Sequence, residues 1–498
     1  MKKYLFFRIL RSFLSIFLVT TITYIIIYSL IPKRDVFSQD PLIQKLASRP
    51  DKLLDYKNTA YHKMNYLDYY DTQTLVNKVQ KAMPNADVSG SHGKKNFNIL
   101  SKWAKKTGFK IKSYPSSKRY YAIRDLPLWE RLGRFYGNLV KIDTPWSVKD
   151  KNNPNLKRYL KIENDKWVGW ALVGSGTKYR YQIYFNNSFP FIHQNIIHFD
   201  LGTSYPTFSG TSVLDVISGR QGATVSEKYN LGNGVTINSA DNVYTRQYQS
   251  KTHRNAFDYD RYKDSYTNLD QNYQDPSMIG TSFRAGIFAL IISYAISIPM
   301  AFFMARFKGK LFDKVGTGIV TLLIAIPSLA FIYAFRYIGA QLFGLPDSFP
   351  TQGAGSFGSW VMPTVILGLL SVSGLVIWFR RYMIDQQQSD YVKFARSKGL
   401  TDNEIYRKHI FKNASIPIVQ NIPGMIIGLI EGATITENIF AMPGMGKMLP
   451  DAILAHNNSI VIGLVFIFTT IGVLSVLLGD ILMVIVDPRI KLSAKGDE

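Results

Sequence analysis

Few residues in this chain have the types and spacing that catalysis or metal binding requires. A phosphate-binding loop of the form Gly-x-x-x-x-Gly-Lys-Ser/Thr is absent, because Gly446-Lys447 is followed by Met448 and lacks the earlier glycine. The 498 residues include no cysteine, which excludes disulfides and thiolate metal sites. The seven histidines are scattered, and His193 and His198 do not have metal-ligand spacing. The sequence therefore predicts neither an enzyme nor a metalloprotein.

The most unusual acidic residue lies in an otherwise apolar run between positions 417 and 437. Glu431 would cost about 3 kcal/mol at the centre of a bilayer, whereas each Ile, Leu or Val of the run returns only about 0.3 to 0.6 kcal/mol. This run is therefore marginal as a lone membrane span. We expect it to be buried among other helices, with Glu431 facing a partner or a water-filled path.

A basic segment over residues 391–417, called the elbow below, precedes and enters this run. Its pattern predicts two short helices. The first ends at Gly399, a residue type that adopts the left-handed C′ conformation without steric cost. The second begins at Thr401, and Glu404 three residues later completes a capping box. Its positive charge places the elbow in water on the cytoplasmic side of a membrane. The basic residues are Lys393, Arg396, Lys398, Arg407, Lys408 and Lys412.

Large apolar side chains also occur in the elbow. Tyr391, Phe394, Ile405 and Tyr406 are expected on a water-exposed loop, where each would gain about 1.5 to 3 kcal/mol by burial in a partner. An ordinary amphipathic surface loop would have little reason to expose four such residues. The elbow is therefore predicted to dock into another protein.

The elements that must position the elbow are long apolar runs. Residues 12–32 are uncharged and follow a basic start, and about 20 such residues cross a hydrocarbon core. We reject a cleaved signal peptide because the run is too long and Ser29-Leu30-Ile31 is a poor cleavage site. Five further spans are expected at about 284–306, 315–337, 359–380, 415–437 and 459–486, which makes six transmembrane helices. Basic residues alternate between the connecting loops so that both termini and the elbow fall in the cytoplasm.

The region between the first two spans, residues 34–280, is polar and long enough for a domain with its own core. By parity of the spans it is extracellular. It contains 36 basic and 22 acidic residues, a net charge of +14, which accounts for much of the total of +24 and removes the need for a nucleic-acid partner. We expect mixed α/β structure, with antiparallel strands over 159–185. Helical spacing occurs at Leu75, Val76, Val79 and Met83 and again at Leu128, Leu132, Phe135 and Leu139.

The elbow resembles the cytoplasmic coupling loop of ABC-importer permeases of the oligopeptide and dipeptide type. The resemblance is carried by Tyr391, Val392, Ala395, Arg396, Lys398, Gly399, Asn413, Ala414 and Pro417. In that family the loop inserts into a cleft of a separate ATPase subunit. The resemblance implies that the coupling residues here are Tyr391, Phe394, Ala395, Arg396, Lys398, Gly399, Thr401, Glu404 and Ile405.

Three further segments carry the same resemblance. Residues 437–446 fit the family pattern Glu-x-x-Phe-x-x-Pro-Gly-x-Gly, and either a pore-lining role or a tight outer turn fits this pattern. Residues 200–204 and 213–220 resemble the short outer segment that precedes the second span. Residues 487–490 resemble the family's C-terminal Asp-Pro-Arg signature. The candidate translocation-path residues are Glu431, Glu437, Phe440, Pro443, Gly444 and Gly446.

Together these features predict an all-α polytopic membrane protein with the ABC type I importer permease fold and a large mixed α/β extracellular domain inserted between helices 1 and 2. The expected divisions are residues 1–33, the first span; 34–280, the extracellular domain; 281–490, the permease core with the coupling loop at 381–414; and 491–498, a cytoplasmic tail. The resemblance implies oligopeptide import across a bacterial plasma membrane. It also implies a second homologous permease, two cytoplasmic ATPase subunits, an extracellular peptide-binding lipoprotein, membrane lipid, and ATP bound only by partner subunits.

Other interpretations of the sequence stay open. The solute of such a permease could be a dipeptide or another small solute such as nickel. The outer domain could receive the loaded binding protein, or it could bind anionic wall polymer through its positive charge and tyrosines. A membrane-anchored cell-wall-binding protein or a sensor without transport is the alternative of a different class. Glu431 could contact the backbone or amino terminus of a peptide in transit, or make a structural hydrogen bond.

Overall fold

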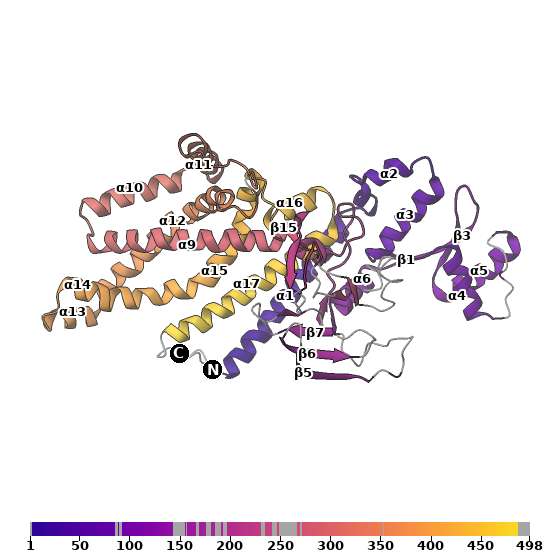
Figure 1. Ribbon diagram of the computed structural model, residues 1–498, viewed down its shortest axis with the longest axis horizontal. Helices are drawn as coiled ribbons and strands as arrows, with labels where there is room; N and C mark the ends of the chain where they lie inside the picture. The colour runs from indigo at the N-terminus through magenta and orange to yellow at the C-terminus, as the bar shows by residue number, and fades with distance from the viewer. Residues whose placement is uncertain are drawn as a thin grey trace.

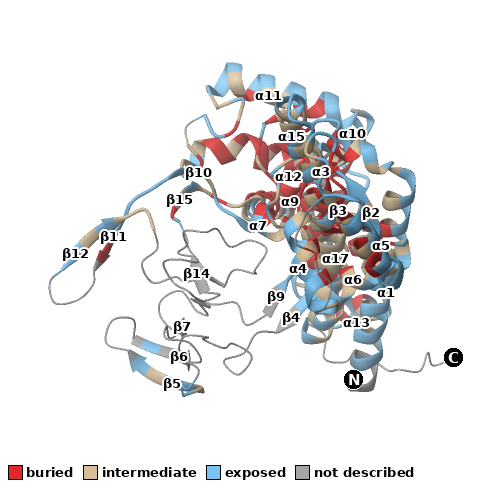
Figure 2. Ribbon diagram, turned by 90° about the vertical axis from the view of Figure 1, so that its right-hand side faces the viewer, coloured by how far each residue is buried: buried red, intermediate tan, exposed pale blue. Residues whose placement is uncertain are grey.

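The computed structural model describes residues 2–84, 88, 92–142, 155, 157–165, 169–175, 181–184, 191–192, 197–230, 235–241, 247–248, 266–268, 271–351 and 353–486. The molecule is elongated, with the long apolar helices in one half and the segment between α1 and α9 in the other (Figure 1). We call that segment, residues 31–277, the insertion. The buried residues concentrate where the long helices pack together, while several hairpins of the insertion project away from them (Figure 2).

Five helices are long and apolar enough to cross a membrane, and a bent pair makes up to six among the described residues. These helices begin and end close to the predicted spans, although α9 starts earlier because the hydroxyl of Ser277 caps it by accepting from the Gly280 amide at 3.1 Å. The five are α1 (Lys2–Leu30), α9 (Met278–Arg306), α12 (Phe357–Gln387), α15 (Phe411–Ile439) and α17 (Asn458–Val486).

The segment expected to be one span at 315–337 differs from that expectation. It forms α10 (Leu311–Ala325) and α11 (Ser328–Phe343), which meet at 107°. Pro327 causes the break, because a proline disfavours the helical conformation of the residue before it, and Ile326 is extended with φ −77° and ψ 123°. Counted as one bent span, this pair raises the number of candidate membrane spans among the described residues from five to six.

Helices α9 and α12 pack closely along their length through small residues. A Cβ added to Gly368 of α12 would lie 2.9 Å from the Ala289 carbonyl oxygen of α9, so only glycine allows this approach. The Ser293 hydroxyl of α9 donates to the Gly368 carbonyl at 2.8 Å. This contact joins α12, the helix that leads into the elbow, to α9, whose last residues contact the base of the elbow.

The insertion has mixed α/β structure, as expected. Its first part places α4 and α5 against a three-stranded antiparallel sheet in the order β1-β3-β2, around Leu75, Leu100 and Trp103. Strands β5, β6 and β7 pair antiparallel, which confirms the prediction for 159–185. The helices are η1 (Lys33–Phe37), α2 (Pro41–Leu46), α3 (Pro50–Lys63), α4 (Thr72–Ala82), α5 (Lys94–Thr107), α6 (Leu128–Leu139) and α7 (Val213–Ser218).

The remaining strands form a second small sheet, in the order β5-β6-β7-β8, and several two-stranded pairs. The strands are β1 (Leu67–Tyr70), β2 (Lys110–Ser113), β3 (Tyr120–Asp125), β4 (Val140–Ile142), β5 (Tyr159–Asp165), β6 (Gly169–Ser175), β7 (Tyr181–Tyr184), β8 (Phe191–Ile192), β9 (Ile197–Phe199), β10 (Gln221–Thr224), β11 (Glu227–Asn230), β12 (Thr236–Ser239), β13 (Gln247–Tyr248), β14 (Tyr266–Asn268) and β15 (Tyr273–Asp275).

The insertion is fastened to the ends of α1 and α17. The Arg131 guanidinium of α6 lies between two aromatic rings, 3.9 Å from the Tyr28 centroid of α1 and 4.1 Å from that of Tyr66. At the start of α17, the Asn458 side-chain amide donates to the Tyr66 hydroxyl at 2.8 Å, and that of Asn457 donates to the Ser204 hydroxyl at 2.7 Å. These contacts make the adjacent part of the insertion continuous with the helical half.

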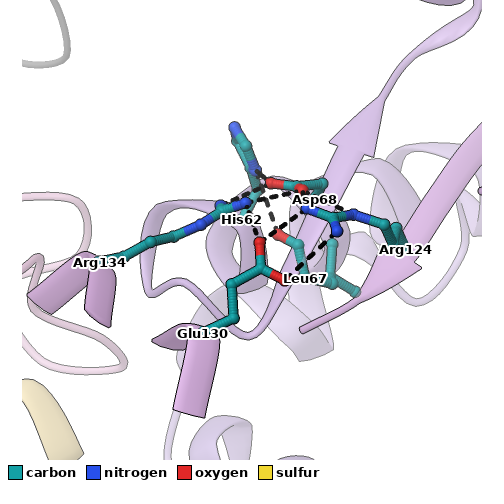
Figure 3. A network of polar contacts seen from close by, with 6 residues as sticks. All are labelled: His62, Leu67, Asp68, Arg124, Glu130 and Arg134. Atoms are coloured by element: carbon teal, nitrogen blue, oxygen red, sulfur yellow. Dashed lines mark hydrogen bonds and ion pairs between the residues drawn. The ribbon is translucent and has the colours of Figure 1, made fainter. Parts of the chain in front are cut away.

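An ion-pair network stabilises the first part of the insertion (Figure 3). Asp68 of β1 accepts from Arg124 of β3 at 2.6 Å and from Arg134 of α6 at 2.7 Å, and Glu130 accepts from both arginines. Burial alone would raise the pKa of Asp68. The hydrogen bonds from Arg134 and Arg124 outweigh burial and lower that pKa below the ordinary 3.8.

We expect Asp68→Asn to destabilise the insertion by about 2 kcal/mol at neutral pH, because it leaves two partly buried guanidinium groups short of an acceptor. In the parent, the unfolded state takes up the Asp68 proton first as the pH falls. The contribution of Asp68 is therefore present above about pH 4 and lost as the pH falls through the lowered folded pKa. Hydrogen exchange of β1 and β3 amides in the full chain measures both effects. Identical exchange in the two proteins at neutral pH would contradict this.

Candidate functional site

The elbow lies at the end of the helical half that faces away from the insertion. Helices α13 (Asp390–Ser397) and α14 (Asp402–Glu404) are at the far tip of the molecule in Figure 1. The start of α1 and the end of α17 point toward the same side, whereas the insertion packs on their other ends. The elbow and the insertion are therefore at opposite ends of the long helices.

The turn after α13 has the predicted left-handed glycine. Gly399 has φ +79°, the Leu400 amide donates to the Ala395 carbonyl at 3.2 Å, and the Gly399 amide donates to the Arg396 carbonyl at 2.9 Å. These two bonds form a Schellman motif, which satisfies carbonyls that the helix leaves open. A Cβ at Gly399 would meet nothing within 4 Å, so backbone conformation alone selects glycine here.

The predicted capping box is also confirmed. The Thr401 hydroxyl accepts from the Glu404 amide at 3.4 Å, and the Glu404 carboxylate accepts from the Thr401 amide at 3.1 Å. The chain continues through a π-helical segment, η2 (Ile405–Ile410), directly into α15. A rotation of the elbow is therefore transmitted to α15 without an intervening flexible loop.

The base of the elbow is held by the ends of two other long helices. The Gln387 side-chain amide at the end of α12 donates to the Ala305 carbonyl of α9 at 3.0 Å, and the Tyr406 hydroxyl donates to the same carbonyl at 3.4 Å. The Arg306 guanidinium donates to the Asn403 side-chain oxygen at 3.1 Å. With η2 joined to α15, the elbow is fixed to α9, α12 and α15.

Two of the four apolar residues expected on the elbow surface are instead buried within this chain. Ile405 is fully buried and Tyr406 is 8% exposed, because both pack into the core formed around Phe379 and Met383 of α12. The expectation that a partner buries them is wrong. The π-helical turn directs them inward, and sequence spacing calculated for an α-helix does not anticipate that turn.

The surface that a partner can reach is formed by the remaining elbow residues. Phe394 is 60% exposed, and the Lys398 ammonium lies 4.4 Å from its ring centroid. Arg396 and Thr401 are exposed, whereas Ala395 is buried. Tyr391 and Glu404 are partly buried. The Tyr391 hydroxyl donates to the Gln386 side-chain oxygen at 2.7 Å, and the Glu404 carboxylate accepts from Thr401. The elbow thus presents one exposed aromatic ring among cations.

The predicted Glu-x-x-Phe-x-x-Pro-Gly-x-Gly motif forms a buried clamp at the insertion end of the helices. Glu437 of α15 is 1% exposed, and its carboxylate accepts from the Ser282 hydroxyl of α9 at 2.6 Å and from the Lys447 amide at 2.8 Å. Ser282 in turn accepts from the Met445 amide at 2.8 Å. Lys447 and Met445 belong to the first turn of α16 (Met445–Leu454), where an anion is favourable.

The glycines of this motif make room for the Glu437 carboxylate. A Cβ at Gly444 would lie 2.2 Å from that carboxylate, and a Cβ at Gly446 would lie 2.9 Å from the Thr434 amide nitrogen. Phe440 is fully buried, and its carbonyl accepts from the Phe349 amide at 2.7 Å.

Of the six candidate path residues, four are buried, and Pro443 is partly buried in the turn between α15 and α16. The buried ones are Glu437, Phe440, Gly444 and Gly446. This geometry favours the tight-turn interpretation for the motif. Glu431 lies in α15, and its side chain is outside the described residues, as are residues 487–490 and His193.

Sequence reasoning missed Ser282, the residue that links α9 to the clamp. It lies near the start of α9, five residues past the Ser277 cap, and a lone serine in an apolar segment gives no signal of its own. The hint in the sequence was an acidic residue, Glu437, in an otherwise apolar span 155 residues further along the chain. In residues 200–204 and 213–220, which were predicted to form an outer segment before the second span, Leu201, Val213 and Ile217 pack against the core shared by α15 and α17 at this end of the helices.

Comparison with known proteins agrees with the elbow pattern. Residues 297–492 match the family described as binding-protein-dependent transport system inner membrane component. The chain is 48% identical to the oligopeptide transport system permease protein AmiC of Streptococcus pneumoniae, over 100% of both chains. The chain belongs to the oligopeptide permease family. The match covers the insertion as well as the permease core.

This permease has more distant relatives too. It is 32% identical to the dipeptide transport system permease protein DppB of Lactococcus lactis, over 46% of this chain and 74% of that protein. Among solved structures, the methionine ABC transporter MetNI in an inward-facing conformation is similar over 41% of this chain and 93% of that chain. Its TM-score of 0.35 and identity of 14% are too low to guide the geometry here.

Membership in the family settles the broad nature of the chain. The permease is a multi-pass protein of the plasma membrane with the ABC permease fold, and it works in a complex with ATPase and substrate-binding partners. It is not itself an enzyme, because the ATPase of such transporters is on separate subunits.

Proposed function

We propose that the permease forms the translocation path of an ATP-driven oligopeptide importer and that the elbow is its ATPase-coupling element. The observation that carries this proposal is the division of the elbow into a buried base and an exposed tip. Ile405 and Tyr406 fix the base to α9 and α12, while Phe394 stays exposed beside Lys398. A partner that moves this tip moves three long helices with it.

The full transporter contains, in this proposal, a second homologous permease, two cytoplasmic ATPases and an extracellular peptide-binding lipoprotein. ATP is bound by the ATPase subunits and no cofactor is bound by this chain. In this proposal α10 and α11 count as one bent span, so that six crossings leave both termini on the same side of the membrane as the elbow, and the basic loops assign that side to the cytoplasm. The opposite placement of the elbow and the insertion supports this orientation (Figure 1). Full-length similarity to AmiC favours oligopeptides over dipeptides or nickel.

The insertion serves as the extracellular docking platform for the peptide-loaded binding protein. Its attachment to the start of α17, through Asn458 and through Asn457 directly before it, supports this role. A docking platform has to hold the binding protein in line with the entrance of the translocation path. A cell-wall-binding module would not require such attachment. Removing the insertion and measuring docking against wall binding separates the two.

A pair of substitutions tests the coupling role. Phe394→Ala should change the stability of the permease by less than about 0.5 kcal/mol, because the ring is mostly exposed, and yet weaken ATPase association. Ile405→Ala should destabilise the permease itself by about 2 to 5 kcal/mol, because it leaves a cavity in the core. Thermal unfolding and co-purification of the ATPase measure the two effects. Normal ATPase association by the stable Phe394→Ala protein would argue against the proposal.

Glu431 tests the translocation path. If its carboxylate contacts the backbone or amino terminus of the peptide in transit, Glu431→Gln should lower uptake several-fold and alter selectivity, because a neutral amide cannot pair with an amine. Competition among peptides with free and acetylated amino termini measures selectivity. Uptake at the parent rate and with parent selectivity would restrict Glu431 to a structural role.

A further inference from the structure

A groove with basic and apolar walls lies between α9, α10 and α12, near the elbow end of the helices. Its volume is about 500 Å³, within the range of small-molecule sites. One part of its lining is apolar and comes from all three helices: Met304 of α9, Val320 of α10, and Ile377 and Ile384 of α12. A ligand that fills this part needs a hydrocarbon portion.

The polar part of the groove carries an excess of positive charge. Lys308 follows the end of α9, and Arg380 and Arg381 are neighbours on α12. Lys308 and Arg381 are exposed and form no ion pair with any residue that the structure describes. Asp385 is the one acidic residue of the lining. The groove therefore suits an anion that also has hydrogen-bond donors for the Asp385 carboxylate.

The third cation is held in place. The Arg380 guanidinium donates to both oxygens of Asp313 of α10, at 2.7 and 2.8 Å, and Asp313 also accepts from the Gly309 amide at 2.8 Å. Although paired, the Arg380 side chain is 28% exposed. This bidentate pair fixes the width of the groove at one point, because it joins α10 to α12.

The depth of the groove corresponds to the edge of a bilayer. Arg380 precedes the first residue of α13, Asp390, by less than three helical turns, and Lys308 lies in the turn between α9 and α10. Beyond the groove, α10 exposes Ile319 and Leu322 as a lipid-facing surface would. Basic pockets between transmembrane helices at this level bind anionic lipid headgroups.

We propose that this groove binds an anionic glycerophospholipid of the cytoplasmic leaflet. Lys308 and Arg381 contact the phosphate, Asp385 accepts from headgroup hydroxyls, and an acyl chain lies along the apolar wall. The assignment to the cytoplasmic leaflet rests on the proposed orientation of the permease. Because Arg380 and Asp313 join α10 to α12 at the groove, the lipid would brace the helix that leads into the elbow.

The test uses the assembled complex purified in mild detergent from membranes rich in phosphatidylglycerol. Bound phosphatidylglycerol is counted by native mass spectrometry for the parent, for Lys308→Gln with Arg381→Gln, and for Lys310→Gln with Lys314→Gln. The last pair removes the same charge near the same end of the helices, from the α9–α10 turn and the start of α10, and neither residue lines the groove. We expect about tenfold lower retention in the groove variant and parent-like retention in the control. A second arm adds phosphatidylcholine or inorganic phosphate as competitor, and neither should displace the lipid.

Equal retention in the two variants would overturn the inference, as would displacement by inorganic phosphate, which would make the groove a site for free phosphate. These outcomes are separate from the proposed function: a complex that contains ATPase and imports peptide but retains no phosphatidylglycerol contradicts the groove alone.

Discussion

Gly399→Val should leave the permease in the membrane at parent levels while lowering peptide uptake about tenfold or more, with ATP hydrolysis continuing. Gly399 has φ +79°, a conformation that costs a β-branched residue on the order of 1–3 kcal/mol. No neighbour lies within 4 Å of the added Cβ, so the strain changes only the angle between α13 and α14. Phe394 at the exposed tip is then held at a different angle to the buried base of the elbow. Movement of the ATPase on ATP hydrolysis is therefore no longer transmitted to the long helices.

Gly399→Asn is the matched control, because asparagine tolerates the left-handed conformation. It should restore most of the uptake. Uptake and ATPase activity are measured together in proteoliposomes that contain the whole complex. Parent-like uptake by Gly399→Val would show that the turn geometry is unimportant for coupling, and equal loss in both variants would show that any side chain at this position blocks docking.

Glu437→Leu should reduce the stability of the permease by about 2–4 kcal/mol and its abundance in the membrane accordingly. The change removes the acceptor of the Ser282 hydroxyl and the Lys447 amide, and each hydrogen bond to a charged group contributes about 1.5–3 kcal/mol. Gly444→Ala should act in the same direction, because its Cβ would lie 2.2 Å from the carboxylate. Thermal unfolding of the purified complex measures both.

Gly428→Ala is the control for Gly444→Ala: it adds the same methyl group at a glycine of α15, the helix that carries Glu437, where the Cβ would meet nothing within 4 Å. It should leave stability near that of the parent. The opposite pattern, with Glu437→Leu as stable as the parent but altered in peptide selectivity, would place Glu437 in the translocation path and contradict the clamp.

Local backbone rules predicted the elbow well. A glycine between two short helices and a Thr-x-x-Glu pattern each have one favoured geometry, and the φ of Gly399 and the Thr401–Glu404 capping box have that geometry. These features depend on residues within five positions of one another. Sequence alone therefore contains the needed information.

Features that depend on distant contacts could not be predicted in this way. The inward direction of Ile405 follows from a π-helical turn that packs on α12, and the burial of Glu437 depends on Ser282, which is 155 residues away. The 107° bend at Pro327 was also missed, because an apolar run gives the same hydropathy whether its helix is straight or broken. For Ile405 and Glu437 the determining partner lies elsewhere in the chain, whereas the bend comes from Pro327 itself, a local signal that the hydropathy of the run does not register.

The most direct test of the coupling claim uses the absence of cysteine from the natural sequence. Single cysteines replace Ser397, an exposed residue of α13 close to Phe394, and Lys102, an exposed residue of α5 in the insertion. Ser397 is chosen so that Phe394 itself stays intact. Both variants are treated in intact cells with a membrane-impermeant maleimide and, after permeabilisation, with a short thiol-to-amine cross-linker. Position 102 should be labelled from outside, and position 397 should be reached only after permeabilisation and cross-link to an ATPase subunit. Labelling of position 397 from outside, or a purified complex without any ATPase cross-link, would contradict the account.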